Sequence, residues 1–223
     1  MTWQEYTRAW SALHGGFDPA TATPLVRGWL RLAYRGGRVL ARLGVTPTAV
    51  TVAGLLLCLA VPVLVPAGPA GLIAAAFVVL AASFADSFDG AVAVVAGKTS
   101  RFGSVVDSVA DRLGEAAWLT AFWLAGAPGW VVVTGGAASW LHEYVRARAT
   151  AAGMPDIGAV TVGERPTRVS VAISGLLIGG AAGLMHGGWD AAVMTVAAVV
   201  WLVLSLIGLG QLAAAVHRAL PTG

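Results

Sequence analysis

Two closely spaced pairs of aspartates are the residues of this sequence whose type and spacing could do chemistry. Asp86 and Asp89 are three residues apart, and Asp107 and Asp111 are four apart, so each pair would share one face of a helix. Both pairs lie in long apolar runs, where an ionised carboxylate is costly unless it is paired or hydrated. If the two helices are antiparallel neighbours joined by a short loop, the four carboxylates converge on one small volume.

Divalent cations would resolve the repulsion among these carboxylates. Hard oxygen ligands without a nearby His or Cys favour Mg²⁺, Mn²⁺ or Ca²⁺ over zinc. Four shared carboxylates suit a two-metal site, which clamps a phosphoryl group during in-line displacement. The nearest cation in the sequence, Arg112, is better placed to pair with Glu115, three residues on, than with its neighbour Asp111. Gly90 and Gly103 leave backbone approachable beside the metals.

Two other interpretations of the carboxylates stay open on charge clustering alone. Intramembrane aspartates also line proton and cation pathways, so a divalent-cation or proton-coupled transporter is one alternative. The other alternative is structural, with protonated carboxyl groups that form hydrogen bonds between helices.

The apolar runs that carry these carboxylates indicate an all-α integral membrane protein. Of the 223 residues, 57% are hydrophobic and 11% charged, whereas a soluble domain has about a quarter charged residues. A spanning helix needs about 20 mostly apolar residues. We predict six such helices, at Ala49–Val65, Ala70–Ala96, Gly103–Leu124, Trp130–Ala151, Thr167–Met185 and Trp189–Leu209. Residues 1–44 are expected to form an N-terminal cytoplasmic segment, and residues 45–218 one six-helix membrane domain.

Basic residues gather on one side of this predicted membrane domain. They precede the first span, flank the loop that holds Lys98 and Arg101, border the connection between the fourth and fifth spans, and follow the sixth. The short turns near Gly68, Gly129 and Gly188 carry no Lys or Arg. This positive-inside pattern predicts a protein of the plasma membrane with both termini and the active site at the cytoplasmic face.

The segment from Thr23 to Arg42 is predicted to be an amphipathic helix at the membrane surface. Its apolar residues and its arginines form two separate stripes at helical spacing, and Pro24 suits the first helical turn. A basic helix of this kind fits an anionic leaflet. The alternative is an ordinary surface helix that packs against the membrane domain.

The spacing of the aspartates also resembles the signature of a known family. The CDP-alcohol phosphotransferases share the pattern D-x2-D-G-x2-A-R-x8-G-x3-D-x3-D, and seven of its eight fixed positions are matched in this sequence by Asp86-x-x-Asp89-Gly90-x-x-Ala93 and Gly103-x-x-x-Asp107-x-x-x-Asp111. Val94 stands where the family has Arg. Upstream, Pro47-x-x-x-Thr51 looks like the family's entry to its first span.

The resemblance implies a reaction in which an alcohol hydroxyl displaces CMP from a CDP-linked substrate, usually CDP-diacylglycerol. It implies two ions, Mg²⁺ or Mn²⁺, bound by Asp86, Asp89, Asp107 and Asp111, with Asp111 also acting as the base that takes the hydroxyl proton. It further implies a homodimer in membrane lipid, and no nucleic-acid partner is expected.

The resemblance also implies a nucleotide and CDP-lipid site, lined by Thr48, Thr51, Gly90, Ala93, Lys98, Ser100, Arg101 and Gly103. Because Val94 removes the family's arginine, we hypothesise that Lys98 or Arg101 supplies the missing positive charge.

The acceptor side resembles that of actinobacterial phosphatidylinositol phosphate and phosphatidylglycerophosphate synthases within this family. Arginine suits bidentate binding of phosphate, so we expect inositol phosphate or glycerol phosphate as the acceptor, bound by Arg146, Arg148, Arg165 and Arg168. Alternatively, these charges only set the topology at helix ends. Glu143 replaces a small polar residue, and Leu212 stands where a further Arg would be expected. Both departures favour an uncharged or cationic alcohol as the competing acceptor.

Overall fold

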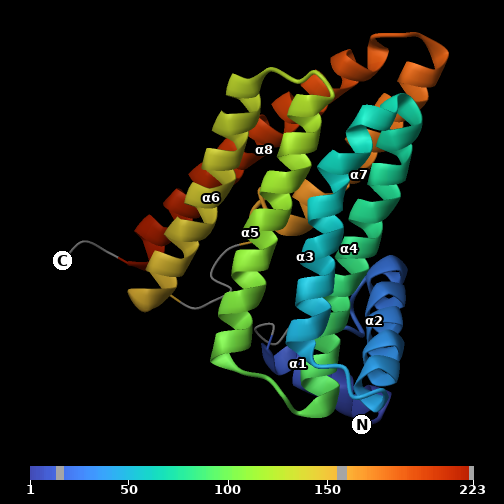
Figure 1. The fold of residues 1–223 in the computed structure, drawn as a ribbon. Coiled ribbons are helices and arrows are strands. Elements are labelled where there is room, and N and C mark those ends of the chain that lie inside the picture. The colour runs from blue at the N-terminus through green and yellow to red at the C-terminus, as the bar shows by residue number, and fades with distance from the viewer. Residues whose placement is uncertain (14–17, 155–159, 221–223) are drawn as a thin grey trace. The chain divides into compact units, whose positions relative to one another are not determined.

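The computed structural model describes residues 1–13, 18–154 and 160–220, and the regular elements in this part of the chain are all helical (Figure 1). In order they are α1 (Trp3–Leu13), α2 (Pro24–Arg42), α3 (Pro47–Leu64), the 3-10 turn η1 (Val65–Ala67), α4 (Gly68–Ala96), α5 (Arg101–Leu124), α6 (Gly129–Ala151), α7 (Arg165–Met185) and α8 (Trp189–Ala219). The predicted all-α class is confirmed. The chain divides into a first unit, Met1–Leu56 with Ala81–Asp111, and a second unit, Leu57–Leu80 with Arg112–Gly223.

Within the described residues, three helical stretches are long and apolar enough to cross a membrane. They are Pro47–Ala96, which contains α3 and α4, Arg165–Met185 and Trp189–Ala219. These stretches support a membrane protein. Helices α5 and α6 are not among them. Helix α5 carries five charged residues between Arg101 and Glu115, and α6 carries Glu143, Arg146 and Arg148 near its C-terminal end. The count of six spans therefore stays a prediction.

Helix α2 occupies the segment predicted to be amphipathic. It begins as expected, because Thr23 Oγ1 accepts a hydrogen bond from the Val26 N–H at 3.4 Å and Pro24 opens the first turn. Within the first unit α2 packs on α4. A contact of this kind is expected if α2 is a surface helix that packs against the membrane domain. Its attachment to a lipid surface stays a prediction.

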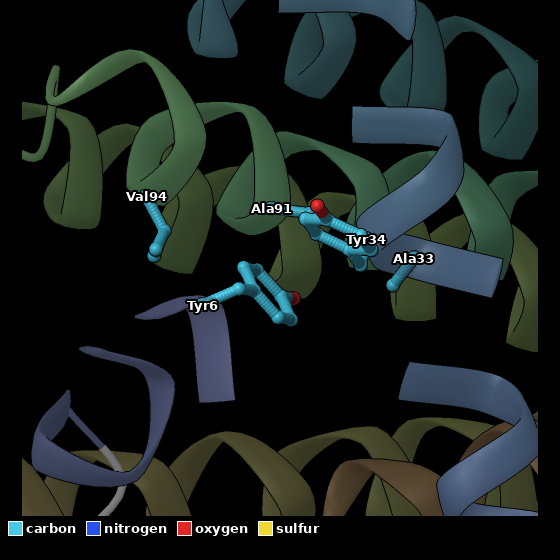
Figure 2. Packing of buried hydrophobic residues seen from close by; sticks show 5 residues of the cluster. All are labelled: Tyr6, Ala33, Tyr34, Ala91 and Val94. Atoms are coloured by element: carbon cyan, nitrogen blue, oxygen red, sulfur yellow. The ribbon is translucent and has the colours of Figure 1, made fainter. Parts of the chain in front are cut away.

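An aromatic cluster joins α1, α2 and the C-terminal part of α4 (Figure 2). The rings of Tyr6 and Tyr34 lie 5.1 Å apart, and Ala33, Ala91 and Val94 complete the buried set. The side chain at position 94, where the family signature has arginine, is only 7% exposed. Valine therefore fits its surroundings in this chain, which are apolar.

Helices α4 and α5 are joined by four residues, and each of the facing helix ends is capped. Gly97 has a φ of 63°, and the Lys98 N–H donates to the Ala93 carbonyl at 2.9 Å, as in a glycine-terminated helix. Ser100 Oγ then accepts from the Gly103 N–H at 3.0 Å and caps the start of α5. This tight connection brings the C-terminal half of α4, with Asp86 and Asp89, close to the N-terminal half of α5, with Asp107 and Asp111.

In the second unit, small residues let α7 lie directly on α8. A Cβ added at Gly175 would lie 2.7 Å from the Ala197 Cβ, too close for a real contact. Helix α6 is tied to α8 by polar groups, since the Trp201 Nε1–H donates to Ser139 Oγ at 2.9 Å. Close packing and buried hydrogen bonds therefore both hold this unit together.

Candidate active site

Three of the four predicted aspartates converge in the first unit. One carboxylate oxygen from each of Asp86, Asp107 and Asp111 lies within 4.8 Å of the other two, and all three residues are half-buried. Two oxygens bound to the same Mg²⁺ are at most about 4.2 Å apart, because each bond is about 2.1 Å long. Small side-chain rotations would therefore let this group hold a divalent cation. The donor set, carboxylate oxygens alone, fits Mg²⁺ or Mn²⁺.

Asp89 lies outside that group of three. It is buried, at 7% exposure, and its Oδ2 accepts a hydrogen bond of 2.6 Å from the Thr51 hydroxyl on α3. Thr51, assigned by resemblance to the nucleotide site, is itself buried. In this structure it fixes the orientation of an aspartate.

The open side of the site follows α4. At about 100° per helical residue, Gly90 and Ala93 share the face of Asp86 and Asp89. A Cβ added at Gly90 would meet nothing within 4 Å. The α4 backbone at Gly90 is therefore open to approach beside the carboxylates.

The other residues assigned to the nucleotide site lie at the nearby helix ends. Thr48 is exposed in the first turn of α3, Lys98 and Ser100 are exposed in the α4–α5 loop, Arg101 is exposed at the start of α5, and Gly103 is half-buried in its first turn. Ser100 also has a structural role, because it caps α5. Their contact with a nucleotide stays a prediction.

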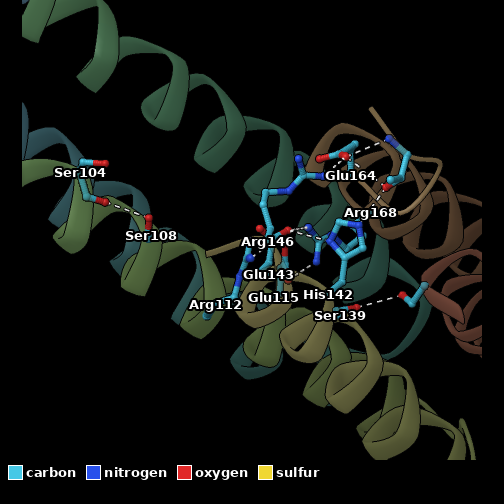
Figure 3. Close-up of polar contacts among 12 residues, drawn as sticks. Ser104, Ser108, Arg112, Glu115, Ser139, His142, Glu143, Arg146, Glu164 and Arg168 are labelled. Atoms are coloured by element: carbon cyan, nitrogen blue, oxygen red, sulfur yellow. Dashed lines mark hydrogen bonds and ion pairs between the residues drawn. The ribbon is translucent and has the colours of Figure 1, made fainter. Parts of the chain in front are cut away.

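The second unit contains a network of buried charges (Figure 3). Arg112 Nη2 donates to Glu115 Oε1 at 3.0 Å, which confirms the predicted pair. The Arg168 side chain, 3% exposed, contacts the other oxygen of Glu115 at 3.3 Å, and it also pairs with Glu143. Glu143 in turn lies 3.2 Å from Arg112 Nη1. Two arginines and two glutamates thus form a ring whose formal charges cancel.

A second polar chain borders this ring. His142, 1% exposed, is hydrogen-bonded through Nε2 to Thr161 Oγ1 at 2.9 Å. The Thr161 N–H donates to Glu164 Oε1 at 3.0 Å, and Glu164 also pairs with Arg146. Glu164 therefore connects the loop before α7 to α6.

The four arginines predicted to bind the acceptor differ in their surroundings. Arg146 and Arg168 are paired with glutamates, whereas Arg148 is exposed on α6 and Arg165 is half-buried at the start of α7. Glu164 as the partner of Arg146 and Glu115 as a partner of Arg168 were not predicted from the sequence. A signal for Glu115 and Arg168 was available, because a charge inside a predicted span needs a partner.

Comparisons with known proteins agree on one family. The family model described as CDP-alcohol phosphatidyltransferase matches residues 44–216. The archaetidylinositol phosphate synthase of Pyrococcus horikoshii is 34% identical over 138 residues, 61% of this chain and 72% of that protein. The phosphatidylinositol phosphate synthase of Mycolicibacterium smegmatis is 34% identical over 158 residues, 66% of this chain and 68% of that protein.

Solved structures show the same similarity. The crystal structure of Mycobacterium tuberculosis phosphatidylinositol phosphate synthase with CDP-DAG bound matches with a TM-score of 0.71 and 28% identity, over 86% of this chain and 96% of that one. The structure of the same synthase in complex with manganese and citrate matches with a TM-score of 0.70, over 85% of this chain and 90% of that one.

Proposed function

Because this chain belongs to the CDP-alcohol phosphatidyltransferase family, we propose that it transfers the phosphatidyl group of CDP-diacylglycerol to inositol phosphate and releases CMP. The predicted family and the predicted class of enzyme are confirmed by the match over residues 44–216. The observation that carries the proposed chemistry is the convergence of three carboxylates within 4.8 Å. The acceptor is proposed from the names of the relatives, which are synthases of phosphatidylinositol phosphate and archaetidylinositol phosphate.

We assign the metal ions to Asp86, Asp107 and Asp111. Asp89 lies beside them, and its hydrogen bond from Thr51 fixes its orientation. Mg²⁺ or Mn²⁺ bound there would neutralise charge on the diphosphate and on the leaving CMP. The similar synthase solved with manganese supports this choice of metal.

In the reaction, Asp111 takes the proton of the acceptor hydroxyl. The hydroxyl oxygen forms a bond to the phosphorus of the phosphatidyl group, and the bond from that phosphorus to the bridging oxygen breaks, so that CMP leaves with its electron pair. A base needs only hydrogen-bond reach of the nucleophile, and phosphoryl transfer depends mainly on alignment and charge neutralisation. The face of α4 at Gly90 and Ala93 is where we place the diphosphate.

For the acceptor, we divide the four arginines by their surroundings. Arg168 is buried against two glutamates, so we assign it a positioning role. Arg146, Arg148 and Arg165 are then the candidates for contact with the acceptor phosphate. A second acceptor class, an uncharged alcohol, is favoured by the glutamates that pair with Arg146 and Arg168, since they reduce the positive charge available to a phosphate.

We further propose that the enzyme is a homodimer of the plasma membrane with both termini and its site at the cytoplasmic face. The one-sided placement of basic residues supports this orientation. The dimer rests on the family resemblance. In this arrangement residues 1–44 remain outside the bilayer core, and residues 45–218 form the membrane domain.

The proposal is tested by measuring CMP release from CDP-diacylglycerol with the full chain purified in detergent and supplied with Mg²⁺ or Mn²⁺. Inositol phosphate, glycerol phosphate and inositol are offered separately, and inositol phosphate should give the highest rate. Asp111→Asn should abolish release, while the matched control Asp190→Asn on α8 should not. Failure of every acceptor to give CMP would contradict the enzyme, and a higher rate with inositol would select the uncharged class.

A further inference from the structure

Helix α2 contacts α4 behind the candidate metal ligands. Within the first unit, the α4 residues whose side chains contact α2 include Phe84, Ser87, Phe88 and Ala91. Their spacing of three, four and seven residues from Phe84 places them on a single helix face. Ser87 lies between Asp86 and Asp89 in the sequence, so α2 supports the same helical turn that carries both carboxylates.

The supporting face and the carboxylate face point in opposite directions. At about 100° per residue, the mean direction of the four contact positions differs by about 180° from that of Asp86 and Asp89. Residues of α2 that meet this face therefore act on the aspartates only through α4.

One side chain of α2 makes a directed bond to this turn. The Trp29 Nε1–H donates to Ser87 Oγ at 2.8 Å, while the Ser87 hydroxyl donates to the Ser83 carbonyl at 3.1 Å. The indole also stacks on Phe84, with ring centroids 4.4 Å apart. A serine that bonds back to the preceding turn tends to bend its helix. The hydrogen bond that Ser87 accepts from Trp29 therefore affects the local path of α4.

Two glycines bring the α2 backbone against α4. A Cβ added at Gly36 would lie 2.7 Å from the ring of Phe88, and one added at Gly37 would lie 2.6 Å from the Ala91 Cβ. The α2 backbone therefore lies in close contact with α4 at both positions. A contact this close can hold a ligand turn within the roughly 0.5 Å that a productive site needs.

We propose that Trp29 is a positioning residue for the metal-binding turn of α4, acting through its hydrogen bond to Ser87. The inference rests on the proposed function, because it assumes that Asp86 binds the divalent cation. Trp29 sets the position of Asp86 and Asp89 from the opposite side of the helix and touches neither metal nor substrate.

The test is a Mn²⁺ titration of the purified full chain, followed by electron paramagnetic resonance, with CMP release measured in parallel. Trp29→Phe keeps a ring to stack on Phe84 but removes the N–H. Loss of one neutral hydrogen bond corresponds to a weakening of Mn²⁺ affinity by about threefold to tenfold. The Mn²⁺ concentration that half-activates CMP release should rise by the same factor, and kcat at saturating Mn²⁺ should change little. Trp130→Phe, at a residue 71% exposed, is the matched control.

A second variant keeps the inference falsifiable. Ser87→Ala removes the bond from Trp29 together with the bond from Ser87 to the Ser83 carbonyl, so it should weaken Mn²⁺ binding at least as much as Trp29→Phe. The double variant should bind Mn²⁺ no more weakly than Ser87→Ala alone, because the bond that Trp29 makes is already lost. An unchanged Mn²⁺ affinity in Trp29→Phe, with or without a lower melting temperature, would overturn the proposal, as would additive losses. A wild-type chain that binds Mn²⁺ but releases no CMP would contradict only the proposed function, and one that binds no Mn²⁺ would overturn both.

Discussion

Removing the buried carboxylate of Glu115 should destabilise the second unit strongly. Glu115 is 1% exposed and lies 3.0 Å from Arg112 and 3.3 Å from Arg168, which is itself 3% exposed. Glu115→Gln keeps the shape of the side chain but removes one of the two carboxylates in the ring with Arg112 and Arg168, and so leaves a net positive charge there. Breaking a buried ion pair by removing one partner costs about 3–5 kcal/mol, because the other charge stays buried without compensation.

The size of the effect can be stated as a shift in melting temperature. For a protein of this length, each kcal/mol corresponds to about 2–4 °C, so Glu115→Gln should melt about 6–20 °C below the wild type. Glu143→Gln should cost less, since the Glu143 side chain is 27% exposed and partly hydrated. The double variant Glu115→Gln/Arg168→Gln restores a net charge of zero in the ring. It should therefore lose less than the sum of the two single losses.

Thermal unfolding in detergent, followed by circular dichroism, measures the wild type, the single variants Glu115→Gln, Glu143→Gln and Arg168→Gln, and the double variant under one condition. Glu5→Gln, at an exposed position of α1, is the matched control and should melt with the wild type. The reasoning is refuted if Glu115→Gln melts together with this control. It is also refuted if the double variant loses the full sum, because the penalty would then not come from an uncompensated charge.

Three more predictions concern the first unit. Thr51→Val removes the 2.6 Å bond to Asp89 and should reduce CMP release by about 10- to 150-fold, the equivalent of one hydrogen bond to a charged group; an unchanged rate in the CMP assay would contradict this. Gly37→Ala places a Cβ 2.6 Å from an α4 side chain and should lower both CMP release and the melting temperature, whereas Gly28→Ala, with nothing within 4 Å, should lower neither. Burial raises the pKa of Tyr6 from 10.0 to about 12, so its contribution to stability is complete below pH 10 and is lost as the pH rises from 10 to about 12. Proteolysis of α1 should accelerate over that range in the wild type, and Tyr6→Phe should remove this step.

The helices and the convergence of the aspartates could be predicted from the sequence because both depend on local rules. Apolar runs give the helices, and the short loop around Gly97 places Asp86 near Asp107 and Asp111. The same rules did not predict that Asp89 leaves this group. Asp86 and Asp89 differ by about 60° around the helix, and the hydroxyl that holds Asp89 comes from Thr51, 38 residues away.

The buried charges show the limit of sequence reasoning in another way. The pair Arg112–Glu115 was predicted because its spacing of three residues is local. Glu115 and Arg168 are 53 residues apart, and the sequence alone indicates only that each needs a partner. Which partner is found depends on which helices become neighbours. Contacts such as that of Gly175 on α7 with the Phe122 ring on α5, 3.5 Å from an added Cβ, contribute to this choice and have no charge pattern to reveal them.

The departure from the family signature at position 94 matches the packing of the first unit. The family signature has arginine there, but the Val94 side chain is 7% exposed and lies in the cluster that contains Tyr6 of α1. A guanidinium buried at this place would need a partner or pay a large desolvation cost, and the described residues of the cluster include no carboxylate, only apolar side chains and aromatic rings, two of which carry hydroxyl groups. Valine at position 94 therefore suits the packing of α1 against α4. This packing requires no positive charge in place of the missing arginine. If Lys98 or Arg101 replaces the positive charge of the family's arginine, the reason must lie in nucleotide binding and not in packing. Their exposed side chains, just beyond the end of α4, would then contact the diphosphate of the nucleotide.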